Sequence, residues 1–238
     1  ALPIWPLFGV LVPYTFLVML SSYELYRRLV MPASFLVVLF YAIYLVVRNG
    51  TISYQKASGL AMFSGIVIFC FYSFIRLKEL LPVEEYGYDA VFFILLILCF
   101  AWGGDTCAYF AGRAFGKHKL CPVVSPKKTV EGAIGGVLGT MVFGVAATLI
   151  YSIAADRMEA FTRSNIGVSM YVVIALLACV AAVLGIYGDL FASVVKRQCG
   201  IKDYGTIFPG HGGILDRFDS VMFIAPFVTM VITAVFYQ

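Results

Sequence analysis

Apolar stretches of membrane-spanning length recur along the whole chain. A helix needs about 17–25 mostly apolar residues to cross the hydrocarbon core of a bilayer. Seven such stretches can be placed near residues 5–20, 31–47, 57–75, 88–104, 131–154, 167–188 and 219–236. They leave no segment for a soluble domain, and only 13% of the residues are charged, against about 25% in soluble domains. The sequence therefore predicts an all-α, polytopic integral membrane protein.

Two longer polar regions, 105–130 and 189–218, interrupt this pattern. They concentrate positive charge, because they hold nine of the 17 Lys and Arg residues: Arg113, Lys117, Lys119, Lys127, Lys128, Lys196, Arg197, Lys202 and Arg217. Loops rich in Lys and Arg normally stay on the cytoplasmic side of a membrane. We therefore expect both regions to face the cytoplasm.

The same rule produces a conflict near the beginning of the chain. Alternating the spans backwards from 105–130 places Arg27 and Arg28 on the outer side, where positive charge is disfavoured. Either the rule is broken here, or an additional span is missing between Arg28 and Pro32. The strength of the charge bias favours the second alternative.

The polar regions begin with two similar segments. Helical spacing would place Asp189, Ser193, Lys196 and Arg197 on one face, because residues three, four, seven and eight apart overlie one another on a helix. An offset of 84 residues aligns Gly104-Asp105-x-x-Ala108-x4-Arg113-x-x-Gly116 with Gly188-Asp189-x-x-Ala192-x4-Arg197-x-x-Gly200. The identities fit either chance or a parallel internal repeat. A true repeat would predict a site at the interface of the two helix ends.

The residue types in these regions suit phosphate chemistry. Asp189, Asp216 and Asp219 lie close in sequence to Lys and Arg, and Mg²⁺ prefers one or two carboxylates together with phosphate oxygens and water. Lys and Arg neutralise phosphates. The glycines that flank His211 would allow backbone amides to approach an anion. These are the parts of a nucleotide-dependent phosphoryl or nucleotidyl transfer site.

Two motifs carry a family resemblance. The first motif reads Ser193-x-x-Lys196-Arg197-x4-Lys202-Asp203-x-Gly205-x3-Pro209-x-His211-Gly212-Gly213-x-x-Asp216-Arg217-x-Asp219. It resembles the signature of the phosphatidate cytidylyltransferases, also called CDP-diacylglycerol synthases. The upstream segments Asp105-Thr-x-Ala108-Tyr109-x-x-Gly112-Arg113-x-Phe115-Gly116-Lys117 and Ser125-Pro126-Lys127-Lys128-Thr129-x-Glu131-Gly132 are also similar to that family, so the resemblance covers about 100–238. It implies a Mg²⁺-dependent enzyme that converts CTP and phosphatidic acid to CDP-diacylglycerol and pyrophosphate.

The resemblance and the residue types together give a set of candidate site residues. The resemblance makes Asp189 and Asp216 the expected metal ligands. The expected catalytic residues are Asp189, Asp216, Asp219, Lys196 and Arg197. The expected substrate-binding residues are Ser193, Lys202, His211, Gly212, Gly213, Arg217, Asp105, Arg113, Ser125, Lys127, Lys128 and Thr129. Whether the Ser125–Thr129 group holds the lipid head group or the triphosphate stays open, and His211 could instead simply cap a turn.

The expected organisation is one integrated membrane domain. Residues 1–104 would supply N-terminal transmembrane helices, and 105–238 would form the catalytic region with its polar cavity facing the cytoplasm. The expected partners are CTP, phosphatidic acid and membrane lipid, with no nucleic acid, and the expected location is the bacterial inner membrane. A homodimer is left open.

Rival functions and simpler structural roles also have to be considered. A CTP-dependent lipid-alcohol kinase or a transporter would share some of these features, whereas a CDP-alcohol phosphotransferase requires an Asp-Gly motif that the chain lacks. Gly135, Gly136 and Gly139 are expected to be small residues at a helix–helix contact rather than ligand contacts.

Overall fold

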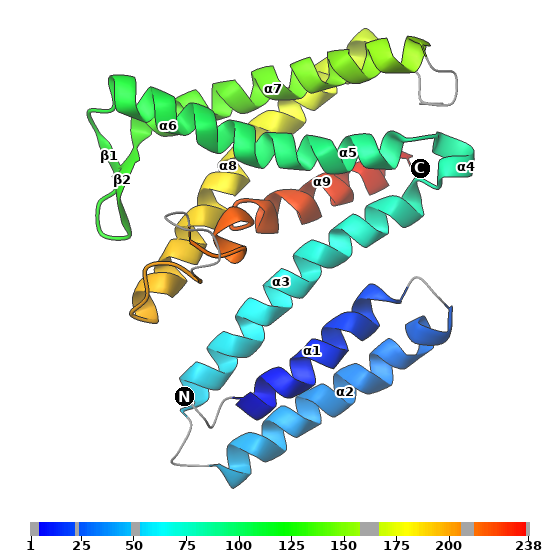
Figure 1. The fold of residues 1–238 in the computed structure, drawn as a ribbon, viewed down its shortest axis with the longest axis vertical. Helices are drawn as coiled ribbons and strands as arrows, with labels where there is room; N and C mark the ends of the chain where they lie inside the picture. Colours follow the sequence, from blue (N-terminus) through cyan, green and yellow to red (C-terminus); the bar gives the residue numbers. More distant parts are fainter. Residues whose placement is uncertain (1–4, 22–23, 49–52, 158–166, 206–211, 237–238) are drawn as a thin grey trace. The chain divides into compact units, whose positions relative to one another are not determined.

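The computed structural model describes residues 5–21, 24–48, 53–157, 167–205 and 212–236. Helices dominate these segments, as the sequence predicts (Figure 1). The chain forms two compact units, Ala1–Ile75 and Arg76–Gln238. The helical stretch Asp89–Phe115 runs through residue 104. The expected division of function at that residue stays a prediction.

The first unit consists of helices α1 (Trp5–Met19) and α2 (Glu24–Val47) and most of α3 (Tyr54–Leu80). Helices α1 and α2 lie side by side in Figure 1, and the hydroxyl groups of Tyr14 and Ser34 form a 2.9 Å hydrogen bond between them. Helix α2 is continuous through residues 28–32, so the two residues between which an extra span was expected belong to one helix here.

The second unit begins with the last residues of α3, which are followed by a short helix, α4 (Val83–Tyr86), and a long helical stretch. The stretch combines α5 (Asp89–Leu98), the π-helical turn η2 (Cys99–Gly103) and α6 (Gly104–Phe115). The expected loop 105–130 is therefore shorter than predicted, because the helix continues to Phe115 and ends only at Gly116, whose backbone is extended. Single π turns are frequent at functional sites, and this one directly precedes Asp105.

A small antiparallel hairpin follows α6, although the sequence predicted no strands. Strand β1 (Lys119–Cys121) pairs with β2 (Ser125–Thr129), with Lys119 opposite Thr129 and Cys121 opposite Ser125. Helix α7 (Val130–Arg157) starts immediately afterwards. Thr129 caps it, since its Oγ1 accepts a 3.1 Å hydrogen bond from the Gly132 N–H. The hairpin is thus fixed to the beginning of α7.

Helices α6 and α7 pack closely through small side chains. A Cβ atom added at Gly135 would lie 2.2 Å from the Cβ atom of Ala111, and one added at Gly139 would lie 2.3 Å from the Cβ atom of Cys107. One added at Gly136 would lie 3.0 Å from the Cβ atom of Ala108. The prediction that these glycines form a helix–helix contact is confirmed.

The remaining elements are α8 (Val168–Gln198), the short 3-10 helix η3 (Leu215–Arg217) and α9 (Val221–Phe236). Helix α8 continues ten residues beyond the predicted span end at 188 and carries the Asp189–Arg197 segment on its last turns. A Cβ atom at Gly188 would lie 2.6 Å from the carbonyl oxygen of Asp219. This glycine therefore lets the chain before α9 contact α8.

The predicted spans correspond to apolar helices in the structure. Five helical stretches in the described residues are long and apolar enough to cross a membrane, and Gly9–Met19 and Val221–Ala234 are shorter apolar helices. The polytopic membrane fold is confirmed.

Candidate active site

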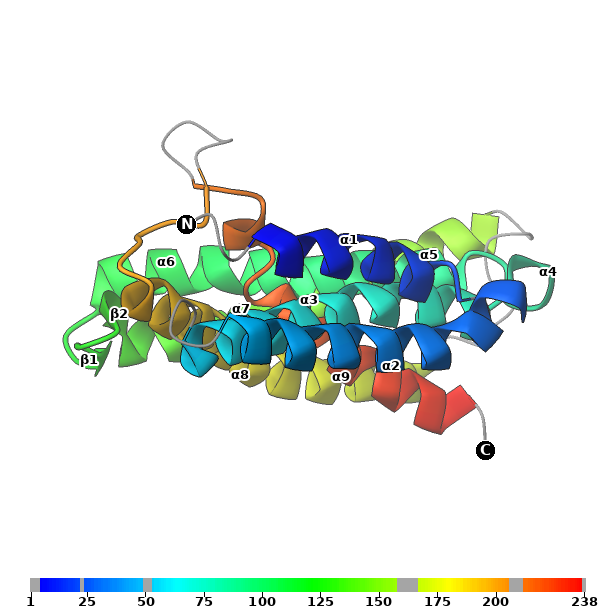
Figure 2. The same cartoon turned by 90° about the horizontal axis from the view of Figure 1, so that it is seen from below.

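A pocket of about 470 Å³ lies at one end of the second unit. Its wall combines side chains from α6, the hairpin, the start of α7, the last turns of α8 and the segment 216–219. Figure 2 shows the hairpin and the end of α8 at the same end of this unit. Charged groups on the wall are Asp105, Arg113, Lys127, Lys128, Asp189, Asp216 and Asp219. The two polar regions of the sequence therefore form one site.

Asp189 on α8 is connected to the hairpin across this pocket. The Nζ atom of Lys128 on β2 lies 2.5 Å from Asp189 Oδ2. Ser193, one helical turn further along α8, donates a 3.3 Å hydrogen bond to Asp189 Oδ1. Both side chains of the ion pair are about three-quarters buried, with exposed fractions of 24% and 25%. The pair therefore links two elements that are distant in sequence.

Asp216 in η3 accepts hydrogen bonds on both of its carboxylate oxygens. Lys196 Nζ lies 2.9 Å from Oδ1, and the backbone N–H groups of Tyr204 and Gly213 each donate to Oδ2 at 2.8 Å. Burial alone would raise the pKa of Asp216, but the Gly213, Lys196 and Tyr204 hydrogen bonds outweigh burial and hold this pKa below its usual range. Asp216 is therefore an ionised group at the centre of a fixed network.

Asp219 has the opposite electrostatic environment. Burial, followed by the negative charges of Asp189 and Asp105, raises the pKa of Asp219 to about 7. The Ser220 N–H donates to Asp219 Oδ1 at 2.9 Å, and the Ser220 hydroxyl donates to Asp105 Oδ2 at 3.2 Å. Ser220 thus holds two of the pocket carboxylates next to each other. Such a group of carboxylates favours a bound cation.

The donor chemistry of the pocket fits Mg²⁺. No group of three acidic, His or Cys side chains that could hold a metal is present among the described residues, and Mg²⁺ usually needs only one or two carboxylates plus phosphate and water. A carboxylate has about four acceptor sites. Asp189 uses two and Asp216 three in the hydrogen bonds and ion pairs described above. Each therefore keeps capacity for at least one metal–oxygen bond.

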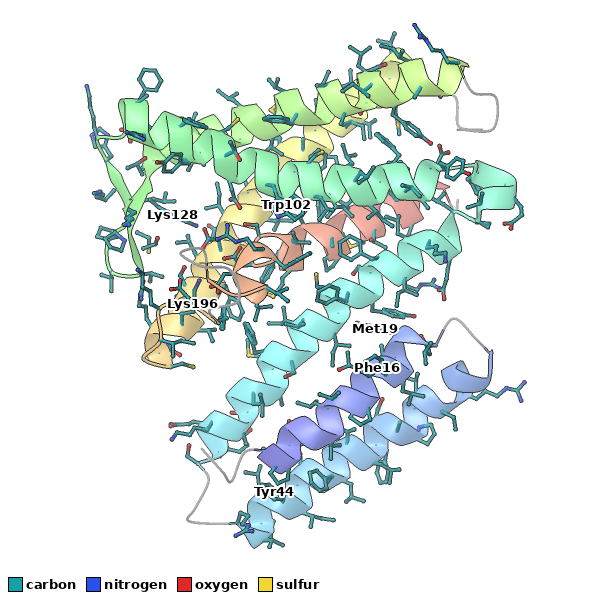
Figure 3. The ribbon with its side chains drawn as sticks, viewed as in Figure 1. Phe16, Met19, Tyr44, Trp102, Lys128 and Lys196 are labelled. Atoms are coloured by element: carbon teal, nitrogen blue, oxygen red, sulfur yellow. The ribbon has the colours of Figure 1, made fainter. Side chains whose placement is uncertain are left out.

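The structure separates the predicted basic residues into two groups. Arg113, Lys127 and Lys128 line the pocket. Arg197, Lys202 and Arg217 are exposed and, in the described part of the chain, do not belong to the pocket wall. Lys196 on α8 is buried, and Figure 3 labels it together with Lys128 of β2. The cations nearest the pocket therefore come mainly from α6 and β2.

The glycine-rich segment encloses a carboxylate. Gly212 has a positive φ of 82°, and a Cβ atom there would lie 2.8 Å from Asp216 Oδ2. A Cβ atom at Gly213 would lie 2.9 Å from the backbone nitrogen of Gly205. Within the described residues the close contacts of these glycines are with Asp216 and Gly205. The predicted residue His211 lies outside the described residues.

The remaining predicted residues have identifiable positions. Ser125 begins β2 opposite Cys121, and Thr129 ends β2, lines the pocket and caps α7. Asp105 and Asp189, the equivalent residues of the suggested repeat, both line the same pocket. The preceding glycines, Gly104 and Gly188, both occupy positions where a Cβ atom would clash with a neighbour. Each of the two similar segments therefore contributes one carboxylate to the pocket wall and one glycine to a close packing contact.

Sequence reasoning assigned no role to three residues that organise the site. Tyr204 places its ring 5.3 Å from Lys196 Nζ and donates its hydroxyl hydrogen to the Ala192 carbonyl at 3.1 Å. Ser220 contacts Asp105, as described above. Glu131 accepts hydrogen bonds from the Lys117 and His118 N–H groups at 3.1 and 3.2 Å, which fixes the turn before the hairpin. The Asp–Ser sequence 219–220 was the available signal for Ser220, whereas Tyr204 had none.

Comparisons with known proteins identify the family of this chain. The model of the cytidylyltransferase family matches residues 5–235. The chain is 34% identical over 185 residues to the phosphatidate cytidylyltransferase of Bacillus subtilis (strain 168), an alignment that covers 78% of this chain and 61% of the relative. It is 39% identical over 144 residues to the phosphatidate cytidylyltransferase of Staphylococcus haemolyticus (strain JCSC1435), with 60% of this chain and 50% of the relative covered. The chain spans about half to three-fifths of the length of these relatives. The chain belongs to the cytidylyltransferase family.

Proposed function

We propose that this protein transfers the cytidylyl group of CTP to phosphatidic acid, giving CDP-diacylglycerol and pyrophosphate. The observation that carries the proposal is the pocket in which four carboxylates face Arg113, Lys127 and Lys128. A triphosphate and a lipid phosphate both need cations, and a divalent ion between them needs carboxylates. The two named relatives, both phosphatidate cytidylyltransferases, support the choice of substrates.

The reaction requires positioning and charge stabilisation rather than a protein nucleophile. An oxygen of the lipid phosphate forms a bond to the α-phosphorus of CTP, and the bond from that phosphorus to the oxygen bridging to the β-phosphate breaks. The electron pair leaves with pyrophosphate. The pocket cations would neutralise the two substrates so that their like charges can approach. Ordered positioning by the Lys196–Asp216 network would keep the pocket wall in place.

Mg²⁺ is the proposed metal, held by Asp189 and Asp216 with Asp105 and Asp219 nearby. When bound, the ion would supply charge stabilisation for the phosphate groups. Burial first, and then the negative charges of Asp189 and Asp105, raise the pKa of Asp219, and a bound cation would offset these negative charges. The proposal includes a location in the inner membrane with the pocket facing the cytoplasm, where CTP is made.

The experiment supplies CTP labelled at the α-phosphate and counts label in a chloroform-soluble product. We expect incorporation only with phosphatidic acid and Mg²⁺, together with one pyrophosphate released per lipid product. Release of CDP with a phosphorylated lipid alcohol would instead identify a kinase. Label that stays entirely in the aqueous phase with phosphatidic acid present would refute the proposal.

Matched variants connect this activity to the pocket. Asp189→Asn removes a proposed metal ligand and should lower turnover by orders of magnitude, because metal charge stabilisation contributes several kcal/mol. Asp203→Asn is the control, since Asp203 is exposed and lies outside the pocket wall. Equal activity of the two variants across a magnesium titration would rule out the metal site.

A further inference from the structure

The tip of the β1–β2 hairpin, Pro122 to Val124, is apolar, and two of its three residues are exposed. Val123 has 92% of its surface exposed, and Pro122 is also exposed. Exposed apolar side chains on the membrane-spanning helices are explained by contact with lipid. The tip lies between the stretches Asp89–Phe115 and Val130–Ala155 and belongs to neither. Its exposed apolar surface therefore requires a separate explanation.

The residues around the hairpin place it at the level of a membrane interface. Phe115, the last residue of α6, is 70% exposed, and Tyr109 and Phe110 on the same helix are 60% and 62% exposed. Aromatic side chains are enriched where helices leave the hydrocarbon region. Lys117 and Lys119 follow and are exposed. Long cationic side chains at helix ends reach toward lipid head groups.

The hairpin carries positive charge that has no acidic partner. Neither Lys119 nor Lys127 forms an ion pair in the part of the chain that the structure describes. An apolar tip flanked by lysines is complementary to an anionic phospholipid, whose acyl chains contact the tip and whose phosphate contacts the cations. Lys128 differs from these two lysines because it is paired with Asp189.

The hairpin is also part of the pocket wall. Leu120, Lys127 and Lys128 all line the pocket, so the hairpin presents both apolar and cationic groups to it. Lys127 is four residues after Val123, so the two residues lie at most about 13 Å apart, and closer than that because Val123 and Val124 belong to the turn. Interfacial elements bury their apolar groups about 5–10 Å below the head groups. A tip in the acyl region would therefore leave Lys127 at the level of the phosphates.

We propose that the hairpin tip inserts into the membrane interface and that Lys127 binds the phosphate of the anionic phospholipid substrate as it enters the pocket. This inference rests on the proposed function, and it assigns the lipid head group to the outer part of the pocket at Lys127. The triphosphate of the nucleotide then occupies the inner part, near Lys128 and the carboxylates.

The kinetic test uses Val123→Asp in mixed micelles in which CTP and phosphatidic acid are varied separately. We expect the KM for phosphatidic acid to rise about tenfold, with kcat and the KM for CTP unchanged. Val123→Leu should behave like the unchanged protein. Val168→Asp is the control, because Val168 is 83% exposed but begins α8, 21 residues before Asp189, or about 30 Å along the helix. An unchanged KM for phosphatidic acid in Val123→Asp, or an equal rise in the control, would overturn the proposal.

Lys127→Ala tests the head-group assignment. It should raise the KM for phosphatidic acid, whether long-chain or short-chain and water-soluble, without raising the KM for CTP. Val123→Asp should raise the KM only for the long-chain lipid, because the soluble substrate does not approach through the interface. A Lys127→Ala enzyme whose KM changes for CTP alone would move Lys127 to the nucleotide.

A binding measurement separates this inference from the proposed function. In anionic vesicles, the tryptophan added by Val123→Trp should show the fluorescence emission of an indole in an apolar environment. Lipids with brominated chains should quench this emission. The unchanged protein provides the background from Trp5 and Trp102. Unquenched, water-like emission would overturn the insertion of the tip. If no CDP-diacylglycerol is formed under any condition, the proposed function fails, while the quenching result still decides the insertion.

Discussion

Lys128 on strand β2 and Asp189 on helix α8 form a 2.5 Å ion pair across the candidate active site. The pair joins the two polar regions of the sequence, and it places a cation beside a proposed metal ligand. The neighbouring Lys127 lines the same pocket without such a partner among the described residues. Adjacent lysines are therefore held in different electrostatic environments.

Replacing Lys128 by Met should lower kcat/KM for CTP by about 10-fold to 150-fold. A charge-assisted contact contributes roughly 1.5–3 kcal/mol, and about 1.4 kcal/mol corresponds to a factor of ten. Lys119→Met is the matched control, because Lys119 lies on the same hairpin but does not line the pocket. Steady-state kinetics with varied CTP would check this, and similar losses in both variants would argue for a general effect of hairpin charge.

Asp216→Asn should destabilise the protein more than the double variant Asp216→Asn with Lys196→Met. The two side chains are only 7% and 11% exposed, and removing one partner of a buried ion pair costs about 3–5 kcal/mol because the other charge stays unpaired. The double variant leaves no unpaired charge. Thermal unfolding in detergent would rank the three proteins, and activity should be lost in both variants. A double variant less stable than Asp216→Asn would contradict the network described here.

Gly135→Ala should lower stability by about 1–3 kcal/mol, which is the usual effect of overpacking a tight contact. The new Cβ atom would lie 2.2 Å from the Cβ atom of Ala111, which cannot rotate away. Gly65→Ala in α3 is the control, since nothing lies within 4 Å of its added Cβ atom, and alanine is the better helix former by about 0.5–1 kcal/mol. Opposite shifts of the two melting temperatures are expected.

Cysteines placed at Lys119 and Lys202, in a background without the native cysteines, should react with a membrane-impermeant thiol reagent from the cytoplasmic side. A cysteine at Glu85, which is exposed, should react from the other side. Glu85 precedes the 27-residue stretch Asp89–Phe115, whose length is about 40 Å and sufficient to cross a bilayer. Opposite labelling of the 119 and 202 positions would be incompatible with a pocket built from both polar regions.

Much of the fold followed from short-range information in the sequence. Apolar length alone located the helices, because the bilayer fixes how many apolar residues a span needs. The carboxylates at 189, 216 and 219 were identified from residue type and the one at 105 from the suggested repeat and the family resemblance, and all four line one pocket. The helix ends were less accurate, since α6 and α8 continue to Phe115 and Gln198 while carrying polar residues.

The distribution of charges around the pocket depended on tertiary structure. Helical periodicity relates Lys196 and Arg197 only to their own helix, and it could not reveal that Lys196 turns inward to Asp216 while Arg197 is exposed. Tyr204 contacts Lys196, Asp216 and Ala192 through its ring, backbone and hydroxyl group, and no local pattern specifies such a set. The sequence by itself determined the membrane class, the positions of the spans and the types of charged group available. Only the packing of α6, the hairpin, α8 and η3 decided which charges meet, because contacts between distant segments depend on the whole arrangement of helices.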